Sequence, residues 1–379
     1  MTIEPFSVVV DDAELKDLRH RLAQTRWPEP VEGAGWSTGT DVGYLRDLCE
    51  YWEKEYDWRR TEAELNRWPQ FTTQVDGQRI HFLHVRSSVP GARPLMLLHG
   101  WPSSVLEFSK VIAPLIDPVA HGGDAADAFH VVVPSLPGYG WSGPTTKPGW
   151  DVDRIAAAMT VVMERLGYDS YGLLGGDWGS PIASRMTLAT PDRVSGLYLT
   201  LVSVPPVPPE DDPTPEEQRL AAEFEQYAAA ETGYIAIQAT KPQSLAFGLT
   251  DSPAGLAAWI VEKLHAWTDC DGDLESVLSR DDILGNITTY WLTGTAGSSI
   301  RLYREAILAG SAGPVDKYVD VRTGVGVFPK ELYRASRRQV ERLYNVRRWT
   351  EMDRGGHFAA LEQPELFIGD VRAFFRELT

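Results

Sequence analysis

The first part of the chain carries apolar residues at helical spacing. Residues 11–28 hold three leucines on one stripe, with acidic residues at the start and a proline at the end; the leucines are Leu15, Leu18 and Leu22. Apolar positions three and four apart share one face of a helix. The pattern therefore predicts an amphipathic helix over this stretch, ended by its proline. Helical and aromatic sequence continues to about residue 68, which predicts a mostly helical N-terminal extension.

The pattern changes from residue 72 onward. Residues 72–86 alternate in the manner of a β-hairpin, with Asp76 and Gly77 at the turn. Helical segments such as 152–167 then separate short, continuous apolar runs, which lie at 94–100, 129–138, 171–177 and 196–202. Strands that are apolar throughout and alternate with helices indicate a mainly parallel sheet with helices on both faces.

The alternation stops at about residue 205, where a proline-rich acidic stretch, "VPPVPPEDDPTPEEQ", reads as a solvated connection. About a hundred helical, aromatic residues follow, and strand-like sequence returns at 318–329 and 345–357 before a closing helix. We therefore expect one α/β sheet interrupted by a helical cap. The expected division is an N-terminal extension, a first core part, a cap and a second core part, at residues 1–70, 71–205, 206–313 and 314–379.

Composition narrows the classes of protein. The 379 residues are 43% hydrophobic and 23% charged, which suits a globular chain with a large core. The formal net charge of −17 disfavours nucleic acid and anionic membrane surfaces as partners. No signal peptide or membrane-spanning run is visible. With only Cys49 and Cys270, a disulfide framework or thiolate metal site is not expected, and the composition fits a reducing cytoplasm.

The stretch "GGDWGS", residues 175–180, has the spacing of a nucleophile elbow but carries a carboxylate at its tip, Asp177. Gly175 and Gly179 allow a tight turn between a strand and a helix, which would hold the Asp177 side chain exposed. The frame alone is weak evidence of catalysis. It becomes stronger because other reactive groups follow predicted strands.

Two further strand ends carry groups that complete a triad. Glu331 follows one predicted strand and His357 follows another, so the chain order is nucleophile, acid, histidine, as in α/β-hydrolases. Three other acids compete with Glu331. Glu305 lies in a predicted cap helix, Asp320 precedes the end of its strand, and Asp353 is too near His357 along the chain, so Glu331 is favoured.

A carboxylate nucleophile restricts the substrate. An attack on an ester would give an anhydride, whereas an attack on a saturated carbon with a leaving group gives an alkyl ester. A histidine-activated water can then cleave that ester at the Asp177 carbonyl. The elbow therefore predicts an alkylating substrate, such as an epoxide or an alkyl halide.

Hydrolysis of that ester needs an oxyanion hole. The stretch "HGWP", residues 99–102, ends the first predicted parallel strand, where such donors belong. The backbone N–H groups of Trp101 and Trp178 are the candidates. His99 is interpreted as a residue that stabilises the turn.

A set of motifs along nearly the whole chain resembles one family, the microsomal-type epoxide hydrolases of the α/β-hydrolase superfamily. These motifs are "HGWPSS", "PSLPGYGWS", "GGDWGS", "ETGYIAIQATKP", "DSPAGLAAWI", "YWLTGT", "SSIRLYRE", "VFPKEL" and "RGGHFAALEQPE". The resemblance implies an α/β-hydrolase fold with a helical cap and an activity on epoxides.

The resemblance also implies roles for residues. Asp177 would be the nucleophile, His357 the general base and Glu331 the acid that orients it. Two cap tyrosines, Tyr234 and Tyr303, would donate protons to the epoxide oxygen. The chemistry needs such donors because an alkoxide is a poor leaving group at neutral pH.

Two other functions stay open at this point. A haloalkane dehalogenase could use the same aspartate, histidine and acid, although halide leaves without a proton and so needs no tyrosines. A catalytically silent protein that binds a hydrophobic ligand is the third reading. For an epoxide hydrolase, the aromatic-rich cap favours a bulky aryl epoxide. The chain also resembles bacterial members of the family that act on epoxide intermediates of aromatic natural products, such as enediyne antibiotics, and this resemblance implies a role in antibiotic biosynthesis. The Ala-, Arg- and Asp-rich composition suits a high-GC actinomycete.

No cofactor is expected, because the chain has no glycine-rich nucleotide fingerprint. His81 and His84 are spaced like a metal-binding pair, but on a strand this spacing places them on opposite faces, so no metal is expected. The partner is a small-molecule epoxide, and the N-terminal extension could form the surface of a homodimer.

Overall fold

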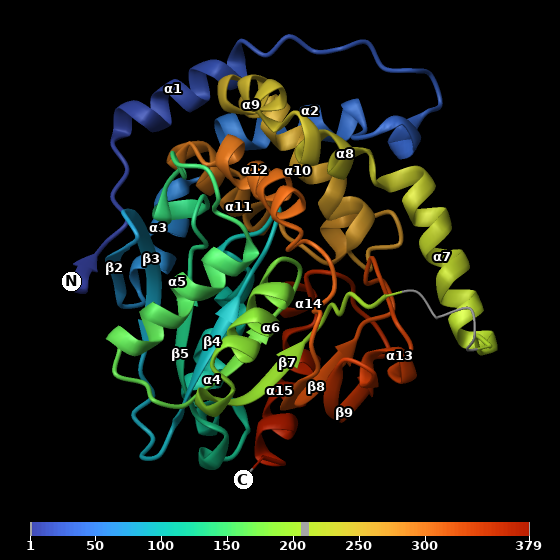
Figure 1. Ribbon diagram of the computed structural model, residues 1–379. Coiled ribbons are helices and arrows are strands. Elements are labelled where there is room, and N and C mark those ends of the chain that lie inside the picture. Colours follow the sequence, from blue (N-terminus) through green and yellow to red (C-terminus); the bar gives the residue numbers. More distant parts are fainter. Residues whose placement is uncertain (1, 206–211, 379) are drawn as a thin grey trace.

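The computed structural model describes residues 2–205 and 212–378. Within these residues, nine strands form a single sheet in the order β1-β2-β3-β5-β4-β6-β7-β8-β9 (Figure 1). The strands are β1 (Glu4–Phe6), β2 (Gln70–Val75), β3 (Gln78–Val85), β4 (Arg93–Leu98), β5 (Phe129–Pro134), β6 (Tyr171–Gly175), β7 (Val194–Leu199), β8 (Val319–Val327) and β9 (Tyr344–Glu351).

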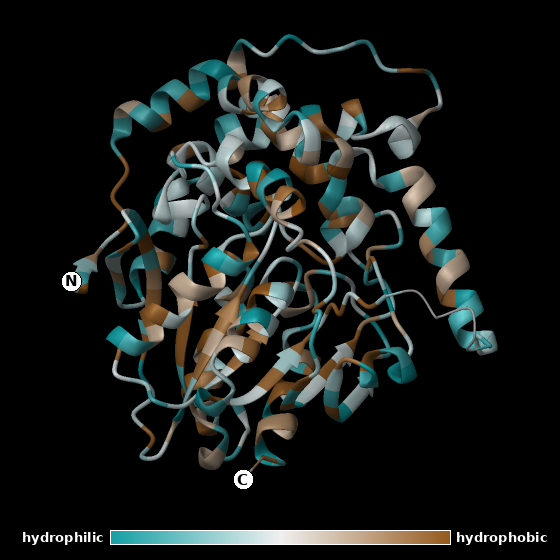
Figure 2. Cartoon of the chain, viewed as in Figure 1, coloured by the Kyte–Doolittle hydropathy of each residue, from teal (hydrophilic) through white to brown (hydrophobic). Residues whose placement is uncertain are grey.

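The sheet is mainly parallel, as predicted. Strands β5, β4, β6, β7, β8 and β9 pair in parallel, and β1, β2 and β3 add an antiparallel edge. The central strands are apolar along their length, for example in β4, where residues 95–98 are fully buried. Figure 2 shows these strands as the most hydrophobic part of the cartoon. Burial of both faces explains why they lack the polar–apolar alternation of an exposed strand.

Helices cover both faces of the sheet. On one side α5 packs on α6, which lies against β4, β6 and β7, while α15 packs on α4 and contacts β7 and β8. The core helices are α4 (Ser109–Ile116), α5 (Val152–Arg165), α6 (Gly179–Ala189), α13 (Arg337–Glu341), α14 (Ala359–Glu362) and α15 (Pro364–Arg376). The sheet and these helices confirm the α/β-hydrolase architecture expected from the sequence.

The N-terminal extension is helical but its first helix is shorter than predicted. Asp11 caps α1 (Asp12–Ala23), which ends five residues before Pro28. The last buried residue of the helix is Leu22. Gln24 is exposed, and its backbone N–H donates to the carbonyl oxygens of His20 and Arg21, which closes the helix. The helix therefore ends where its apolar face ends, not at the proline. Two more helices follow, α2 (Val42–Lys54) and α3 (Trp58–Asn66).

The predicted hairpin is confirmed as β2 and β3. Asp76 and Gly77 both have positive φ, at 51° and 78°, which is the backbone that a tight two-residue hairpin turn requires. Strand β2 begins at residue 70, two residues before the expected start.

Among the described residues between β7 and β8, the chain forms six α-helices. They are α7 (Pro215–Glu231), α8 (Gly233–Thr240), α9 (Pro242–Asp251), α10 (Pro253–Trp267), α11 (Arg280–Thr293) and α12 (Ala296–Ala309). In Figure 1, α8 to α12 lie above the sheet and α7 lies at the right-hand side. Of the proline-rich stretch 204–218, residues 206–211 lie outside the described residues. Its last residues were expected to be a solvated connection but form the first turn of α7, where Glu217 is buried. The exact domain boundaries stay a prediction.

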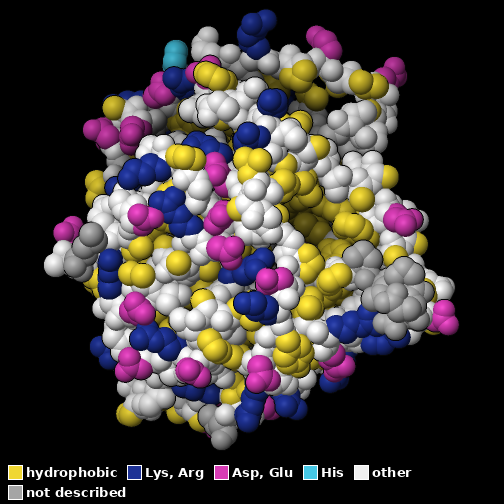
Figure 3. Space-filling view, viewed as in Figure 1, with side chains coloured by type: hydrophobic (Ala, Val, Ile, Leu, Met, Phe, Trp, Pro, Cys, Tyr) yellow, Lys and Arg dark blue, Asp and Glu magenta, His cyan; other side chains and the backbone are white. Residues whose placement is uncertain are grey.

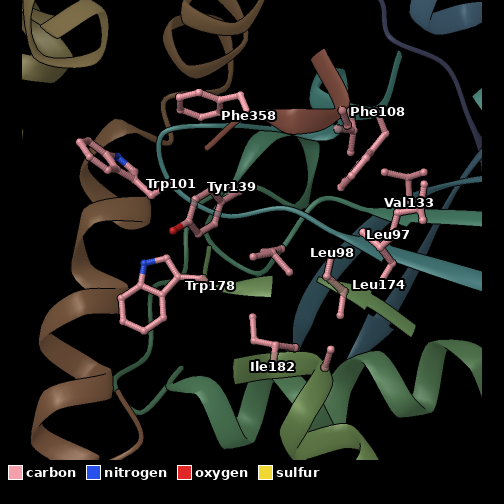
Figure 4. Close-up of a cluster of buried hydrophobic side chains, with 14 of the residues drawn as sticks. Leu97, Leu98, Trp101, Phe108, Val133, Tyr139, Leu174, Trp178, Ile182 and Phe358 are labelled. Atoms are coloured by element: carbon pink, nitrogen blue, oxygen red, sulfur yellow. The ribbon is translucent and has the colours of Figure 1, made fainter. Parts of the chain in front are cut away.

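The core runs continuously from the sheet to an aromatic layer above it. The core includes Leu97 and Leu98 of β4 and Leu174 of β6. The rings of Trp101 and Trp178 lie beyond the ends of these strands (Figure 4). This layer joins the core to the cap and surrounds the candidate site. Across residues 2–205 and 212–378, the helices are too short or too polar to cross a membrane.

Candidate active site

The site begins at the turn between β6 and α6, where Asp177 adopts a φ of +45°. A non-glycine residue with positive φ is strained and is often found where a side chain must be presented for function. Gly175 and Gly179 must be glycines because the backbone passes too close to them for a side chain. A Cβ atom at Gly179 would lie 1.9 Å from the carbonyl oxygen of Leu98, and one at Gly175 would lie 2.3 Å from the carbonyl oxygen of Gly179.

The two carboxylate oxygens of Asp177 have different surroundings. The backbone N–H of Trp101 donates to Oδ1 at 2.7 Å, while Oδ2 lies 3.4 Å from Nε2 of His357. The Asp177 side chain is 17% exposed, so a small molecule can reach it. Gly100 permits the approach, because a Cβ atom there would lie 1.9 Å from Oδ1.

The structure brings one of the two predicted oxyanion donors to the carboxylate. Trp101 donates as expected, but the backbone N–H of Trp178 makes no hydrogen bond to Asp177 within residues 2–205 and 212–378. The indole of Trp178 instead packs edge-on against Tyr303, with ring centroids 4.8 Å apart.

His357 connects Asp177 to Glu331. Its Nδ1 lies 2.6 Å from Oε1 of Glu331, and the same oxygen accepts a hydrogen bond from the N–H of Leu332 at 2.7 Å. The backbone N–H of His357 donates to the carbonyl of Trp267 at 2.9 Å, which fixes the loop after β9 beneath the cap. A bond from Nδ1–H to Glu331 leaves Nε2 to face Asp177.

Two carboxylates control the charge of His357. Burial alone would lower the pKa of this imidazole, but the negative charges of Glu331 and Asp177 and their hydrogen bonds raise the pKa well above its ordinary value. The imidazole is therefore held between two carboxylates, with Nδ1 toward Glu331 and Nε2 toward Asp177.

The competing acids lie in other surroundings. Glu305, on α12, accepts a hydrogen bond from the N–H of Gly149 at 2.7 Å. Asp320 and Asp353 are exposed to solvent. Glu331 is the acid whose carboxylate contacts His357, as the order of strand ends predicted.

The two predicted cap tyrosines meet above Asp177. Tyr234 comes from α8 and Tyr303 from α12, and their ring centroids lie 5.8 Å apart. Tyr234 stacks on Trp101 at 5.4 Å, so the cap packs directly on the turn that donates to Asp177. Burial, helped by the charge of Asp177, raises the pKa of both hydroxyls. Both are therefore protonated at neutral pH and can donate.

Three residues of the site were not predicted from the sequence. Trp267, at the end of α10, touches the rings of Trp101, Tyr234 and His357. Tyr227, on α7, places its hydroxyl near that of Tyr234. Lys263 is buried in α10, one turn before Trp267. Only Lys263 had a signal in the sequence that could have pointed to it: it is a charged residue within the largely apolar stretch "LAAWIVEKLHAW".

The remaining histidines that were singled out make structural contacts. Nε2 of the buried His99 accepts from the N–H of Leu136 at 3.4 Å, and burial lowers the pKa of His99 to about 4, in keeping with its predicted place in the turn. His81 bonds to Ser135, and His84 bonds to the hydroxyl of Tyr168. In the described part of the chain, no group of three or more potential ligands could hold a metal ion.

Comparison with known proteins identifies the family of this chain. Residues 3–108 match the family "Epoxide hydrolase N terminus", and residues 93–234 match the family "alpha/beta hydrolase fold". A Stigmatella aurantiaca protein with the name "Putative epoxide hydrolase" is 49% identical to this chain, over 99% of this chain and 85% of the relative's length. Epoxide hydrolase 1 of Sus scrofa is 36% identical over 98% of this chain and 88% of its own.

A solved structure extends the agreement to three dimensions. The juvenile hormone epoxide hydrolase of the silkworm Bombyx mori superimposes with a TM-score of 0.91 and 32% identity, covering all of this chain and 95% of that one. Fold and site thus define an α/β-hydrolase with a carboxylate at the elbow. The chain belongs to the epoxide hydrolase family, and its activity is that of an epoxide hydrolase.

Proposed function

We propose that this enzyme opens its epoxide through a covalent ester on Asp177. The observation that carries the proposal is the arrangement of the carboxylate: Trp101 holds Oδ1, while Oδ2 lies beside the imidazole that Glu331 orients. Oδ2 forms the new bond to an epoxide carbon, and the bond from that carbon to the ring oxygen breaks.

The leaving oxygen needs a proton as the ring opens. Tyr234 and Tyr303 are protonated, buried hydroxyls on the cap side of Asp177, and they are the donors in this proposal. Hydrogen bonds to the ring oxygen stabilise the charge that develops there, and this stabilisation is strong because water is largely excluded.

The second step is hydrolysis of the ester. His357 takes a proton from water through Nε2, and the hydroxide attacks the carboxyl carbon of Asp177. The oxyanion forms on Oδ1, where the N–H of Trp101 already donates. We keep the N–H of Trp178 as a second donor that engages when the oxyanion forms. The tetrahedral intermediate then collapses, and the ester oxygen takes the proton from His357 and leaves as the second hydroxyl of a vicinal diol. The new carboxylic acid of Asp177 ionises, and its proton restores the tyrosine.

The surroundings of Asp177 support a bulky aryl epoxide as the substrate. The rings of Trp101, Trp178, Trp267, Tyr234 and Tyr303 are joined by contacts at the site. Figure 3 shows a hollow with apolar side chains between α7 and the body of the molecule. We propose this hollow as the route of entry, because an apolar ligand gains by leaving water along such a surface.

Trapping the intermediate tests both parts of the proposal. In the variant His357→Gln, Asp177 and the tyrosines remain but no base activates water. Intact mass spectrometry after mixing with styrene oxide should show the protein heavier by one substrate molecule. The double variant Asp177→Asn with His357→Gln is the matched control and should gain nothing.

Two outcomes would contradict the proposal in different ways. If His357→Gln forms no adduct yet still turns over substrate, the covalent route is wrong. If an aliphatic 1,2-epoxide forms the adduct as fast as styrene oxide, the mechanism stands and the aryl preference fails.

Three further predictions stay proposals. Both cysteines are free and buried, which is compatible with a reducing cytoplasm. A homodimer through the N-terminal extension and a role in bacterial antibiotic biosynthesis rest on the sequence alone.

A further inference from the structure

A buried cation lies against one of the proposed proton donors. The side chain of Lys263 is only 5% exposed, and its Nζ lies 4.8 Å from the centre of the Tyr234 ring and 5.7 Å from that of Trp267. An ammonium group inside a protein is costly unless it is paired. A lysine in this position therefore calls for an explanation from its contacts.

Two carboxylates of the cap pair with this ammonium. Nζ lies 2.6 Å from Oε2 of Glu262 and 3.7 Å from Oε2 of Glu231, and it donates to the carbonyl oxygen of Glu231 at 3.5 Å. These contacts direct the side-chain nitrogen toward the end of α7. The charge beside Tyr234 is thus a fixed part of the structure.

The negative charge on Tyr234 changes during the proposed reaction. As its hydroxyl gives a proton to the epoxide oxygen, the phenol becomes electron-rich, and part of the new charge spreads over the ring. Asp177 is still negative at the start of this step, so the surroundings of the hydroxyl oppose that change. A cation over the ring favours it, since aromatic faces attract cations and an anionic ring attracts them more strongly.

We propose that Lys263 is a positioning residue for epoxide ring opening, which acts through Tyr234. The ammonium stabilises the ring of Tyr234 while the proton moves from its hydroxyl to the leaving oxygen and Asp177 bonds to carbon. This inference rests on the proposed role of Tyr234 as a donor. It assigns no contact between Lys263 and the substrate.

The step balances without another reactant. The C–O bond of the ring breaks, the bond from Asp177 to carbon forms, and the phenol proton ends on the new hydroxyl group. The phenolate is protonated again when ester hydrolysis generates the carboxylic acid of Asp177, which ionises. Lys263 takes no part in the transfer of the proton.

A purely structural role would give different results. Lys263 also ties α10 to the end of α7, so its loss could loosen the cap. Loosening would affect stability and both chemical steps. The proposed role affects ring opening alone, and only while Tyr234 has its hydroxyl.

The test compares Lys263→Met, which keeps the apolar stem, with Lys263→Arg, which keeps the charge. Single-turnover kinetics with styrene oxide separate formation of the alkyl-enzyme from its hydrolysis. Lys263→Met should slow ring opening roughly 10-fold, the size expected for a desolvated cation–π contact, and leave hydrolysis unchanged. Lys263→Arg should recover most of the rate. The matched control is Lys241→Met, at an exposed cap position.

The same substitution in a Tyr234→Phe enzyme tests whether Lys263 acts through the hydroxyl of Tyr234. In Tyr234→Phe, Lys263→Met should have no further effect on ring opening. An equal loss in both steps, or an undiminished loss in the Tyr234→Phe background, would overturn the proposal. If Lys263→Met does not fold, Lys263→Gln can replace it, because its amide can still donate to the Glu231 carbonyl.

The design separates this inference from the proposed function. If Tyr234→Phe opens the epoxide as fast as the parent enzyme, the donor role of Tyr234 fails, and the proposal for Lys263 fails with it. If Tyr234→Phe is slow but Lys263→Met is as fast as the parent, only the role of Lys263 fails.

Discussion

At the residue scale, backbone turns at strand ends position Asp177, Glu331 and His357, whereas the packing of the cap positions Tyr234 and Tyr303. The sequence predicted Asp177 because glycines flank it in the elbow motif. It predicted Glu331 and His357 because both follow strands of one parallel sheet. The roles of Tyr234 and Tyr303 came only from the family resemblance, because a tyrosine on a helix has no local signature of function. Lys263 and Trp267 were missed, since their positions depend on how the cap packs.

The placement of His357 between two carboxylates has a consequence during the reaction. In the resting enzyme, Glu331 and Asp177 raise the pKa of His357 well above its ordinary value, although burial opposes them. In the proposed mechanism the ester on Asp177 is neutral, so one of these charges disappears when the substrate is bound covalently. The pKa of His357 then falls, and the imidazole becomes available as a base at the step that needs one.

The variant Asp177→Asn imitates this loss of charge. We expect the pKa of His357 to be lower in Asp177→Asn than in the parent enzyme, because burial then opposes the charge of Glu331 alone. A titration of the His357 ring by NMR measures it, with Asp320→Asn as a control at an exposed acid. An unchanged pKa in Asp177→Asn would mean that Asp177 does not control the base.

At the element scale, strands were predicted better than helix ends. Apolar runs gave the parallel strands and the Asp76–Gly77 turn gave the hairpin, because both depend on local sequence. The three-residue β1 carries no periodicity of its own and forms by pairing with β2. The end of α1 was misplaced at Pro28 because the loss of a buried face, not the proline, ends the helix.

Helix α7 depends on one buried carboxylate at its start. Glu217 completes a capping box with Thr214 and also accepts hydrogen bonds from Ser336 and Arg338 of the core. The bonds from Arg338 lower the pKa of Glu217 to about 2, although burial opposes this. This residue therefore attaches the edge of the proposed entrance to the body of the molecule.

Replacing Glu217 by Gln should weaken this attachment. We expect a loss of about 1–2 kcal/mol in the free energy of unfolding at pH 7, a modest value because the Arg338 side chain is partly exposed. A lowered pKa stabilises the fold above the ordinary value of 4.5, and this contribution is lost as the pH falls toward 2.

Urea unfolding across this pH range, together with hydrogen exchange of α7, provides the measurement. The difference between Glu217→Gln and the parent should shrink as the pH falls from 4.5 to 2. Glu216→Gln, at the exposed neighbouring position, should match the parent. A difference that persists at pH 2 would mean that the charge of Glu217 does not hold α7.

At the scale of the whole molecule, the site is assembled from distant parts of the chain. Asp177 comes from the first part of the sheet, Glu331 and His357 come from the second, and the tyrosines come from the helices inserted between them. The sequence could predict this plan, because parallel strands end at one edge. It could not predict distances such as the 3.4 Å between His357 and Asp177, which follow from packing over the entire core.

The most direct test of the covalent route through Asp177 is a single turnover in ¹⁸O-water, with enzyme in excess over styrene oxide. The account predicts that the first diol carries ordinary oxygen, taken from the carboxylate, and that the peptide containing Asp177 gains ¹⁸O. If the label enters the diol at once and the Asp177 peptide stays unlabelled, water attacks the epoxide directly. Asp177 would then be a base, and the proposed ester would not form.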